Sequence, residues 1–596
     1  MQASPSRSAP LRIALCLVAC VACGDDSTPP AQDASTDVSA ADARQDGSAS
    51  DAANDAQNTR DAAANDGGED AASMDGGGPG RMITLSALKA FPTAMGAGMF
   101  VTGGRGGKTF FVNTREDLPE DDPAYGSYDE ATDTYAGTLR YCLTEHNTVA
   151  KNVVFLVGGE FTLTQGDLRV NNQQGRSISV LGQTARDIGG VHITGSEFIV
   201  FFDNLDNVIL RFVDFKPGRA FVDRDVTVSA GSVRIGEMTY PIENDRIRIG
   251  SRSYWVDGDN LVREKDGMNI TRTYDIIVDH VTAGWHGDES FEAYAFNLDG
   301  EPFRNVTIQR SLFLPGIRGH NVGGLFGGDA SATVEGAGLI ENGDVHHNCF
   351  VNLTHRFPNI GGGGSARVRV FNNVAYGWGS RLMNLYGDGL LDVFNNYYRR
   401  NPSTAAPSVR DDFRMFKFDF LYDPTGSLAP SVYVAGNFVD GYIEDPEENN
   451  WKLLSHFRDS PRGGNEDPLS SEYQRATPID DAEHPINASN ALDALPDVLN
   501  DVGANVVFGS DGTTRYVDTV DAAYLRQVET TSGPASLPSS EAWVYPDYES
   551  GSVPRGDFDS DGVPLGWTAP SNVVNSAGYS NQELYFAEQA GDFFRL

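Results

Sequence analysis

This chain of 596 residues has few cysteines and only short apolar runs. Beyond the first 23 residues only Cys142 and Cys349 remain, which excludes a disulfide framework and leaves open whether these two pair. The apolar stretch at 13–19 is too short to cross a bilayer, and no later stretch is long enough either. The sequence therefore contains no candidate for a membrane-spanning helix.

Positive charge is also scarce. The chain carries 45 lysines and arginines against 83 aspartates and glutamates, which gives a formal net charge of −38. Such a surface repels nucleic acid, so we expect no nucleic-acid partner. It also repels polyanionic substrates in general, and bound Ca²⁺ is the natural way to offset that repulsion locally.

The N-terminus has the pattern of an export signal. Arg7 and Arg12 flank the apolar stretch, and Leu17-Val18-Ala19-Cys20 resembles the cleavage site of a bacterial lipoprotein. We expect residues 1–23 to be a lipoprotein-type signal peptide with Cys20, or alternatively Cys23, as the lipidated residue. A plain secretory signal is the alternative. The protein is then secreted or held at the cell surface, bound to a bacterial membrane by a lipid anchor only.

Residues 24–80 contain no aromatic residue and no lysine, and Asp, Ala, Ser, Asn and Gly dominate them. A segment of this composition cannot bury enough apolar area to offset its ordering entropy. We expect a disordered linker that holds the folded part away from the membrane.

The folded part contains a repeat. The motif Val-Phe-Asn-Asn occurs at 370–373 and again at 393–396, each time inside an alternating apolar run. Looser copies surround Asn348 and Asn437. Three short strands and their turns account for a period of this length, which predicts a parallel β-helix with stacked asparagines. Two similar hairpins in a β-sandwich are the alternative.

These patterns predict an all-β chain in three parts. Residues 81–440 form the parallel β-helix domain, whose first coil is capped by a short helix near 137–143. Charged alternating strands at 219–265 interrupt it as a β-hairpin insertion. Residues 441–596 form an irregular C-terminal flank and cap with a helix near 491–502. We expect a monomer.

Several motifs then resemble those of one enzyme family, in the family's order. They are Gly103–Gly107, Leu181–Ala185, Arg211-Phe212 with Lys216–Gly218, Tyr274–His280 with Trp285–Glu289, His346–Asn348, His355–Pro358 and Asn395–Tyr398. Together they resemble the pectate lyases of polysaccharide lyase family one, over about residues 90–440. The resemblance implies a right-handed parallel β-helix and a calcium-dependent lyase that cleaves polygalacturonate, an acidic plant polysaccharide, by β-elimination.

The resemblance also implies the calcium ligands. Asp279 is the foremost candidate, followed by Asp288, Glu289 and Asp266. Carboxylates on adjacent coils are suited to this role, because Ca²⁺ prefers several hard oxygen ligands. For each of the four, a solvated or turn-capping carboxylate is the alternative.

In the same family an arginine of an Arg-x-Pro run abstracts the proton, and here this residue is Arg356. A guanidinium gives up its proton reluctantly, so the role requires alkaline pH and close positioning; pairing with a carboxylate is the alternative. The sequence departs from the family at Gly361, where many relatives carry a second arginine. Arg318 and His320 are the candidates for gripping the substrate instead.

A second calcium site is predicted near the C-terminus, where Asp557, Asp559 and Asp561 alternate before Gly562. The twelfth position is Thr568, so the loop is not a complete EF-hand. Two other functions stay open for the chain as a whole. One is a lyase for another uronan or for methylated pectin, and the other is a non-catalytic carbohydrate-binding β-helix at the cell surface.

Overall fold

The computed structural model describes residues 81–596 except for the ranges 172–176, 196–197, 219–224, 296–303, 318–320, 329–339, 363–365, 380–381, 388, 404–415, 420–429, 458–465, 509–513 and 534–547. The expectations for residues 1–23 and 24–80, including Cys20 and Cys23, lie outside the described residues, as do those for Arg318 and His320. Among the described residues, no helix is both long enough and apolar enough to cross a membrane.

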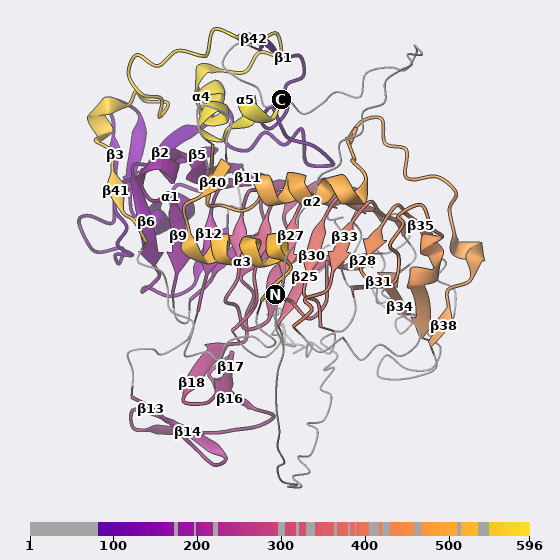
Figure 1. The fold of residues 1–596 in the computed structure, drawn as a ribbon. Coiled ribbons are helices and arrows are strands. Elements are labelled where there is room, and N and C mark those ends of the chain that lie inside the picture. The colour runs from indigo at the N-terminus through magenta and orange to yellow at the C-terminus, as the bar shows by residue number, and fades with distance from the viewer. Residues whose placement is uncertain are drawn as a thin grey trace, which may run out of the picture. The chain divides into compact units, whose positions relative to one another are not determined.

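Three long sheets make up the fold (Figure 1). The first sheet holds, in spatial order, β3 (Gly126–Asp129), β4 (Thr134–Gly137), β2 (Lys108–Val112), β5 (Lys151–Phe155), β8 (Ile178–Leu181), β11 (Asp206–Arg211), β20 (Tyr274–Asp279), β23 (Val306–Gln309), β26 (Gly343–His346), β29 (Arg367–Phe371), β32 (Leu390–Phe394) and β35 (Ser431–Ala435).

The second sheet holds β41 (Gly551–Ser552), β6 (Val157–Thr162), β9 (Val191–Thr194), β12 (Asp214–Lys216), β21 (Thr282–Ala283), β24 (Leu312–Phe313), β27 (Cys349–Val351), β30 (Val374–Tyr376), β33 (Tyr397–Arg399) and β36 (Phe438–Val439). The third sheet holds β7 (Leu168–Asn171), β10 (Val200–Asp203), β19 (Met268–Thr271), β22 (Glu289–Ala295), β25 (Val322–Gly328), β28 (Asn359–Gly362), β31 (Met383–Gly387), β34 (Phe416–Asp419), β37 (Leu454–Phe457) and β38 (Glu466–Pro468).

The chain visits the three sheets in turn, so each coil adds one strand to each sheet. For example, β20, β21 and β22 pair in parallel with β23, β24 and β25 of the next coil. The antiparallel partners β3, β38 and β41 lie at sheet ends. This topology is that of a parallel β-helix, and the expected fold class is confirmed.

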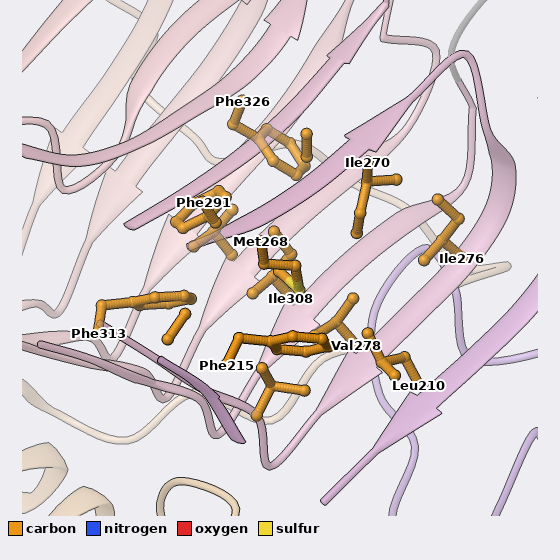
Figure 2. Close-up of a cluster of buried hydrophobic side chains, with 14 of the residues drawn as sticks. Leu210, Phe215, Met268, Ile270, Ile276, Val278, Phe291, Ile308, Phe313 and Phe326 are labelled. Atoms are coloured by element: carbon orange, nitrogen blue, oxygen red, sulfur yellow. The ribbon is translucent and has the colours of Figure 1, made fainter. Parts of the chain in front are cut away.

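The core lies inside the coils, where apolar side chains from all three sheets meet (Figure 2). The side chains labelled there are at most 2% exposed: Leu210, Ile276, Val278 and Ile308 of the first sheet, Phe215 and Phe313 of the second, and Met268, Ile270, Phe291 and Phe326 of the third. Residues of successive coils stack along the axis, because parallel strands in register place equivalent positions above one another.

The repeated asparagines form the ladder that their spacing predicts. Asn348, Asn373, Asn396 and Asn437 are fully buried at the turn between the first and second sheets. The Nδ2 of each donates to the Oδ1 of the next, over 2.9, 3.0 and 2.9 Å, and Asn437 continues to Asn450 at 3.0 Å. Backbone amides donate to the same oxygens, so each coil is tied to the next by paired hydrogen bonds.

Short helices cover the ends and one flank. The helices are α1 (Leu139–Thr144), α2 (Ala491–Asn500), α3 (Thr519–Thr530), α4 (Asn581–Gln589) and α5 (Asp592–Arg595), with 3₁₀ turns η1 (Gly182–Ile188), η3 (Asn450–Leu453), η4 (Ser471–Tyr473) and η6 (Arg555–Asp557). α1 packs its apolar side on the core at the first coil, and α2 and α3 lie across the second sheet (Figure 1). Two small pairs complete the flank: β1 (Ile83–Leu85) with β42 (Val573–Asn575), and β39 (Val506–Phe508) with β40 (Thr514–Tyr516).

The insertion lies between β12 and β19 and is larger than one hairpin. It consists of two three-stranded antiparallel sheets: β13 (Val226–Ser229), β14 (Ser232–Ile235) and β15 (Met238–Pro241), then β16 (Arg246–Ile249), β17 (Arg252–Asp257) and β18 (Asn260–Arg263). The two sheets share a small core of their own that includes Val233, Ile247 and Tyr254. Trp255 of β17 donates from its indole to the carbonyl of Gly287 at 2.9 Å, which ties the insertion to the loop before β22.

Candidate active site

Three of the site residues expected from the sequence lie in one line across the third sheet. Phe291 of β22 pairs with Met268 of β19, which places Glu289 beside Asp266 in the same register. Glu289 in turn pairs with Val322 of β25. The amide of Gly324 donates to the carbonyl of Arg356, so Arg356, which precedes β28 by three residues, lies on the same line.

The acidic side chains of this line converge. Asp266, Asp288 and Glu289 each offer a carboxylate oxygen, and these oxygens lie within 4.8 Å of one another. The amide of Asn269 donates to Asp266 at 2.8 Å and to Glu292 at 2.5 Å, which adds a fourth carboxyl to the group. We call Asp266, Asp288, Glu289 and Glu292 the acidic cluster.

The cluster carries more negative charge than its surroundings can stabilise. Burial and then the charge of Asp266 raise the pKa of Asp288 to about 7, and the same two causes raise the pKa of Glu292 well above its ordinary value. Burial also acts on Asp266, but the positive charge of Lys265 and the cluster's hydrogen bonds outweigh it and lower this pKa. Groups that resist ionisation in this way are suited to binding a cation that replaces their protons.

Arg356 borders the acidic cluster. Its guanidinium donates to the Glu289 carboxylate, and both side chains are about 5% exposed. Its φ is 71°, in the left-handed region that a residue with a β-carbon seldom adopts. A backbone conformation of this kind persists only where the surroundings enforce it, and it is common at functional sites.

Asp279, the foremost ligand candidate, lies elsewhere. It ends β20 in the first sheet, is fully buried, and accepts hydrogen bonds from Arg211 at 2.7 Å and Gln309 at 2.6 Å. The Nδ1 of His280 is 2.9 Å from the same carboxylate. Burial opposes ionisation of Asp279, but His280 and Arg211 outweigh it and hold its pKa well below the ordinary value. The structure therefore gives Asp279 a place in a buried ion-pair network, apart from the acidic cluster.

The aspartates of the C-terminal loop do not converge in the structure. Asp557, Asp559 and Asp561 are exposed, and they are absent from the groups of described residues whose ligand atoms approach closely enough to hold a metal. The Asp559 carboxylate instead accepts hydrogen bonds from the amides of Asp561 and Val563, both at 2.9 Å. This is the turn-capping arrangement, and the calcium loop stays a prediction.

Sequence reasoning missed two groups of residues, one within the site and one outside it. Glu292 and Asn269 had no motif to mark them, although the alternation of β22 places Glu292 on the face opposite the buried Phe291 and Ala293. A second buried group, His192, Asp214 and Asp518, also brings ligand atoms together. Lys216 lies 2.5 Å from the Asp214 carboxylate within that group and supplies a positive charge there.

Comparisons with known proteins identify relatives of this chain by sequence. No family model matches the chain. The protein named probable pectate lyase C from Emericella nidulans is 26% identical over 515 residues, which cover 84% of this chain and 92% of the relative. The proteins of the same name from Aspergillus flavus and Aspergillus terreus are 26% and 25% identical, and each alignment covers 84% of this chain and 94% of the relative. The chain is a homologue of the pectate lyases.

Solved structures of lower similarity include pectate lyases as well. Jun a 1, the major allergen from cedar pollen, is 16% identical with a TM-score of 0.40, and the match covers 69% of this chain and 92% of that one. A pectate lyase from Bacillus sp. N165 in complex with trigalacturonate is 15% identical with a TM-score of 0.35, covering 69% and 98%. The sequence relatives indicate that this pectate lyase homologue is a polysaccharide lyase, the expected enzyme class.

Proposed function

We propose that this chain is a calcium-dependent pectate lyase that cleaves polygalacturonate by β-elimination. The observation that carries the proposal is the single line across the third sheet in which the acidic cluster meets Arg356. Elimination from a uronate needs a group that stabilises negative charge on the carboxylate and a base beside it, and this line holds candidates for both.

The acidic cluster is suited to Ca²⁺. Four carboxyl groups supply the hard oxygen ligands that this ion prefers, on strands that hold them in place. The raised pKa values of Asp288 and Glu292 support the same assignment, because a dication compensates the repulsion that keeps them protonated. We assign Asp266, Asp288, Glu289 and Glu292 as the ligands and Asp279 a structural role.

Calcium, when bound there, neutralises the substrate carboxylate and so acidifies the proton on the carbon beside it. The neutral guanidine form of Arg356, which alkaline pH favours, takes this proton and becomes a guanidinium. The electron pair of the broken carbon–hydrogen bond forms the new double bond, and the carbon–oxygen bond of the glycosidic link breaks. The departing oxygen takes up a proton from solvent water, which yields one unsaturated and one saturated chain end. Glu289 holds the guanidinium in the line of the sheet.

Gly361 favours one second candidate. It lies in β28, where many relatives carry a second arginine, and a glycine has no cationic side chain to bind the substrate carboxylate. A lyase for another uronan or for methylated pectin has less need of that arginine. Activity that needs no calcium supports this second candidate, because an ester already activates the proton.

We also propose that the protein is exported and anchored by a lipid on Cys20 or Cys23. The support is the apolar stretch at 13–19 and the small residues before each cysteine. Metabolic labelling with a fatty-acid analogue tests this proposal. One of the two variants, Cys20→Ser or Cys23→Ser, should abolish the label, and the other should retain it.

The main test is an assay of the full chain on polygalacturonate at mildly alkaline pH. The ultraviolet absorbance of the unsaturated product should rise with calcium and stop rising when a chelator is added in excess. No rise on either polygalacturonate or methylated pectin contradicts the proposed function.

A further inference from the structure

A pair of cations lies beside the acidic cluster on the same sheet. Arg169 of β7 is exposed, and its guanidinium carbon lies 4.3 Å from the ring centroid of Phe201 on β10. The ammonium of Lys265, directly before Asp266, lies 6.0 Å from the same ring. Phe201 itself is only 7% exposed, and its fixed ring makes cation–π contacts with both side chains.

The register of the third sheet connects these residues to the proposed site. Arg169 pairs with Phe201, Phe201 pairs with Asn269, and Asn269 pairs with Glu292. Neighbouring strands lie about 4.8 Å apart, so the backbone at Arg169 is about 10 Å from that at Asn269. A chain laid across the strands from the acidic cluster therefore passes over Lys265 and Phe201 and reaches Arg169.

Arg169 differs from the other arginines of this region. Arg263 and Arg252 both pair with Asp167, and Arg272 pairs with Asp203. The guanidinium of Arg169, in contrast, forms no hydrogen bond or ion pair with any of the described residues, and it lies over the Phe201 ring. On a chain with a net charge of −38, an exposed guanidinium that is held in place and left without a carboxylate is suited to an external anion.

We propose that Arg169, supported by Phe201 and assisted by the charge of Lys265, binds a second uronate carboxylate of the polysaccharide, distant from the one that reacts. This inference rests on the proposed function. The substrate class is an acidic polysaccharide long enough to reach from the acidic cluster to β7. A guanidinium meets a carboxylate through two parallel hydrogen bonds, and its flat contact with Phe201 reduces the entropy lost on binding.

The test compares substrates of different length on the full chain. Arg169→Gln should raise the KM for polygalacturonate about tenfold with kcat unchanged, as expected for the loss of one charge-assisted contact. The KM for a short oligogalacturonate that cannot reach β7 should not change. Arg234→Gln is the matched control, because Arg234 is exposed on β14 of the insertion and should leave both values unchanged. An unchanged KM for polygalacturonate in Arg169→Gln overturns the inference.

Two further measurements separate this inference from the proposed function. Phe201→Leu keeps an apolar side chain but removes the ring, and it should raise the same KM by less than Arg169→Gln does. Direct binding of polygalacturonate, measured by calorimetry with a chelator present, needs no catalysis. If the wild-type protein binds in the presence of chelator but does not cleave in the assay with calcium, and Arg169→Gln weakens binding, the proposed function fails and this inference stands. If the wild type cleaves the substrate and Arg169→Gln binds it as tightly as the wild type does, this inference alone is overturned. If the wild type shows no binding and no cleavage, both the inference and the proposed function are overturned.

Discussion

The guanidinium of Arg356 donates a hydrogen bond to the carboxylate of Glu289, two strands away in the third sheet. The contact joins the candidate base to the acidic cluster, and the two lie on the same line across the third sheet. This ion pair explains how the charged Arg356 side chain can be nearly buried, because the charges of Arg356 and Glu289 compensate each other.

Replacement of this arginine tests its role. Arg356→Ala should lower kcat about a thousandfold, the usual range for loss of a positioned base. Arg356→Lys should keep part of the activity and shift the pH profile toward lower pH, because an ammonium releases its proton more readily than a guanidinium does. Rates of product absorbance against pH measure both. Arg304→Ala, at a surface pair with Asp275, is the control, and full activity in Arg356→Ala contradicts the mechanism.

Glu292 is the proposed calcium ligand that only the structure revealed. Glu292→Gln should weaken calcium binding at least about tenfold, because removal of one carboxylate lowers the ligand charge that sets affinity in oxygen sites. Calorimetric titration of the purified protein with Ca²⁺ measures this without reference to activity. Glu237→Gln, exposed on the insertion, should bind as the wild type does. Equal affinities of the two variants for Ca²⁺ would contradict the assignment of Glu292 as a ligand.

The buried polar network around Asp521 of α3 should make the stability of the fold depend on pH. Asp521 accepts hydrogen bonds from Asn505 at 2.7 Å and Thr282 at 2.9 Å, and its carboxyl is 3.1 Å from Lys216. Burial first, and then the charges of Asp518 and Asp214, raise the pKa of Asp521 to about 7, although Lys216 opposes them.

The sign follows from proton counts. Between about pH 4 and about pH 7 the folded state keeps the Asp521 proton and the unfolded state has lost it, so stability falls as pH rises through this range. The free energy of unfolding of the wild type, relative to Asp521→Asn, should decrease by up to about 1.4 kcal/mol per pH unit there and be level above it. Urea unfolding at several pH values measures the difference. A constant difference contradicts the raised pKa.

The asparagine ladder should contribute strongly to stability. Asn373→Ala removes the acceptor of two Asn348 hydrogen bonds at 3.1 and 2.9 Å and leaves those buried donors without it. The free energy of unfolding should fall by about 2–4 kcal/mol, since buried unpaired polar groups are costly. Thermal unfolding followed by circular dichroism measures this loss. The control is Asn487→Ala, because the Asn487 side chain is exposed, and a similar Tm for the two variants contradicts the ladder's role.

The sequence by itself determined the coil. The motif Val-Phe-Asn-Asn, repeated at 370 and 393, predicts both the parallel β-helix and the asparagine ladder. A buried asparagine that pairs with the asparagine of the next coil requires this residue at a regular spacing in the sequence. Asp266, Glu289 and Arg356 were likewise found from motifs, and they do lie on one line of the third sheet.

Only the tertiary structure decided which acids belong together. Asp279 and Glu289 are ten residues apart in the sequence, but β20 and β22 belong to different sheets, so one joins a structural ion-pair network and the other the acidic cluster. Glu292 and Arg169 carried no motif, because their surroundings come from strands of other coils. Periodicity within a chain fixes the coil, whereas the site depends on which coils stack and which face each side chain occupies.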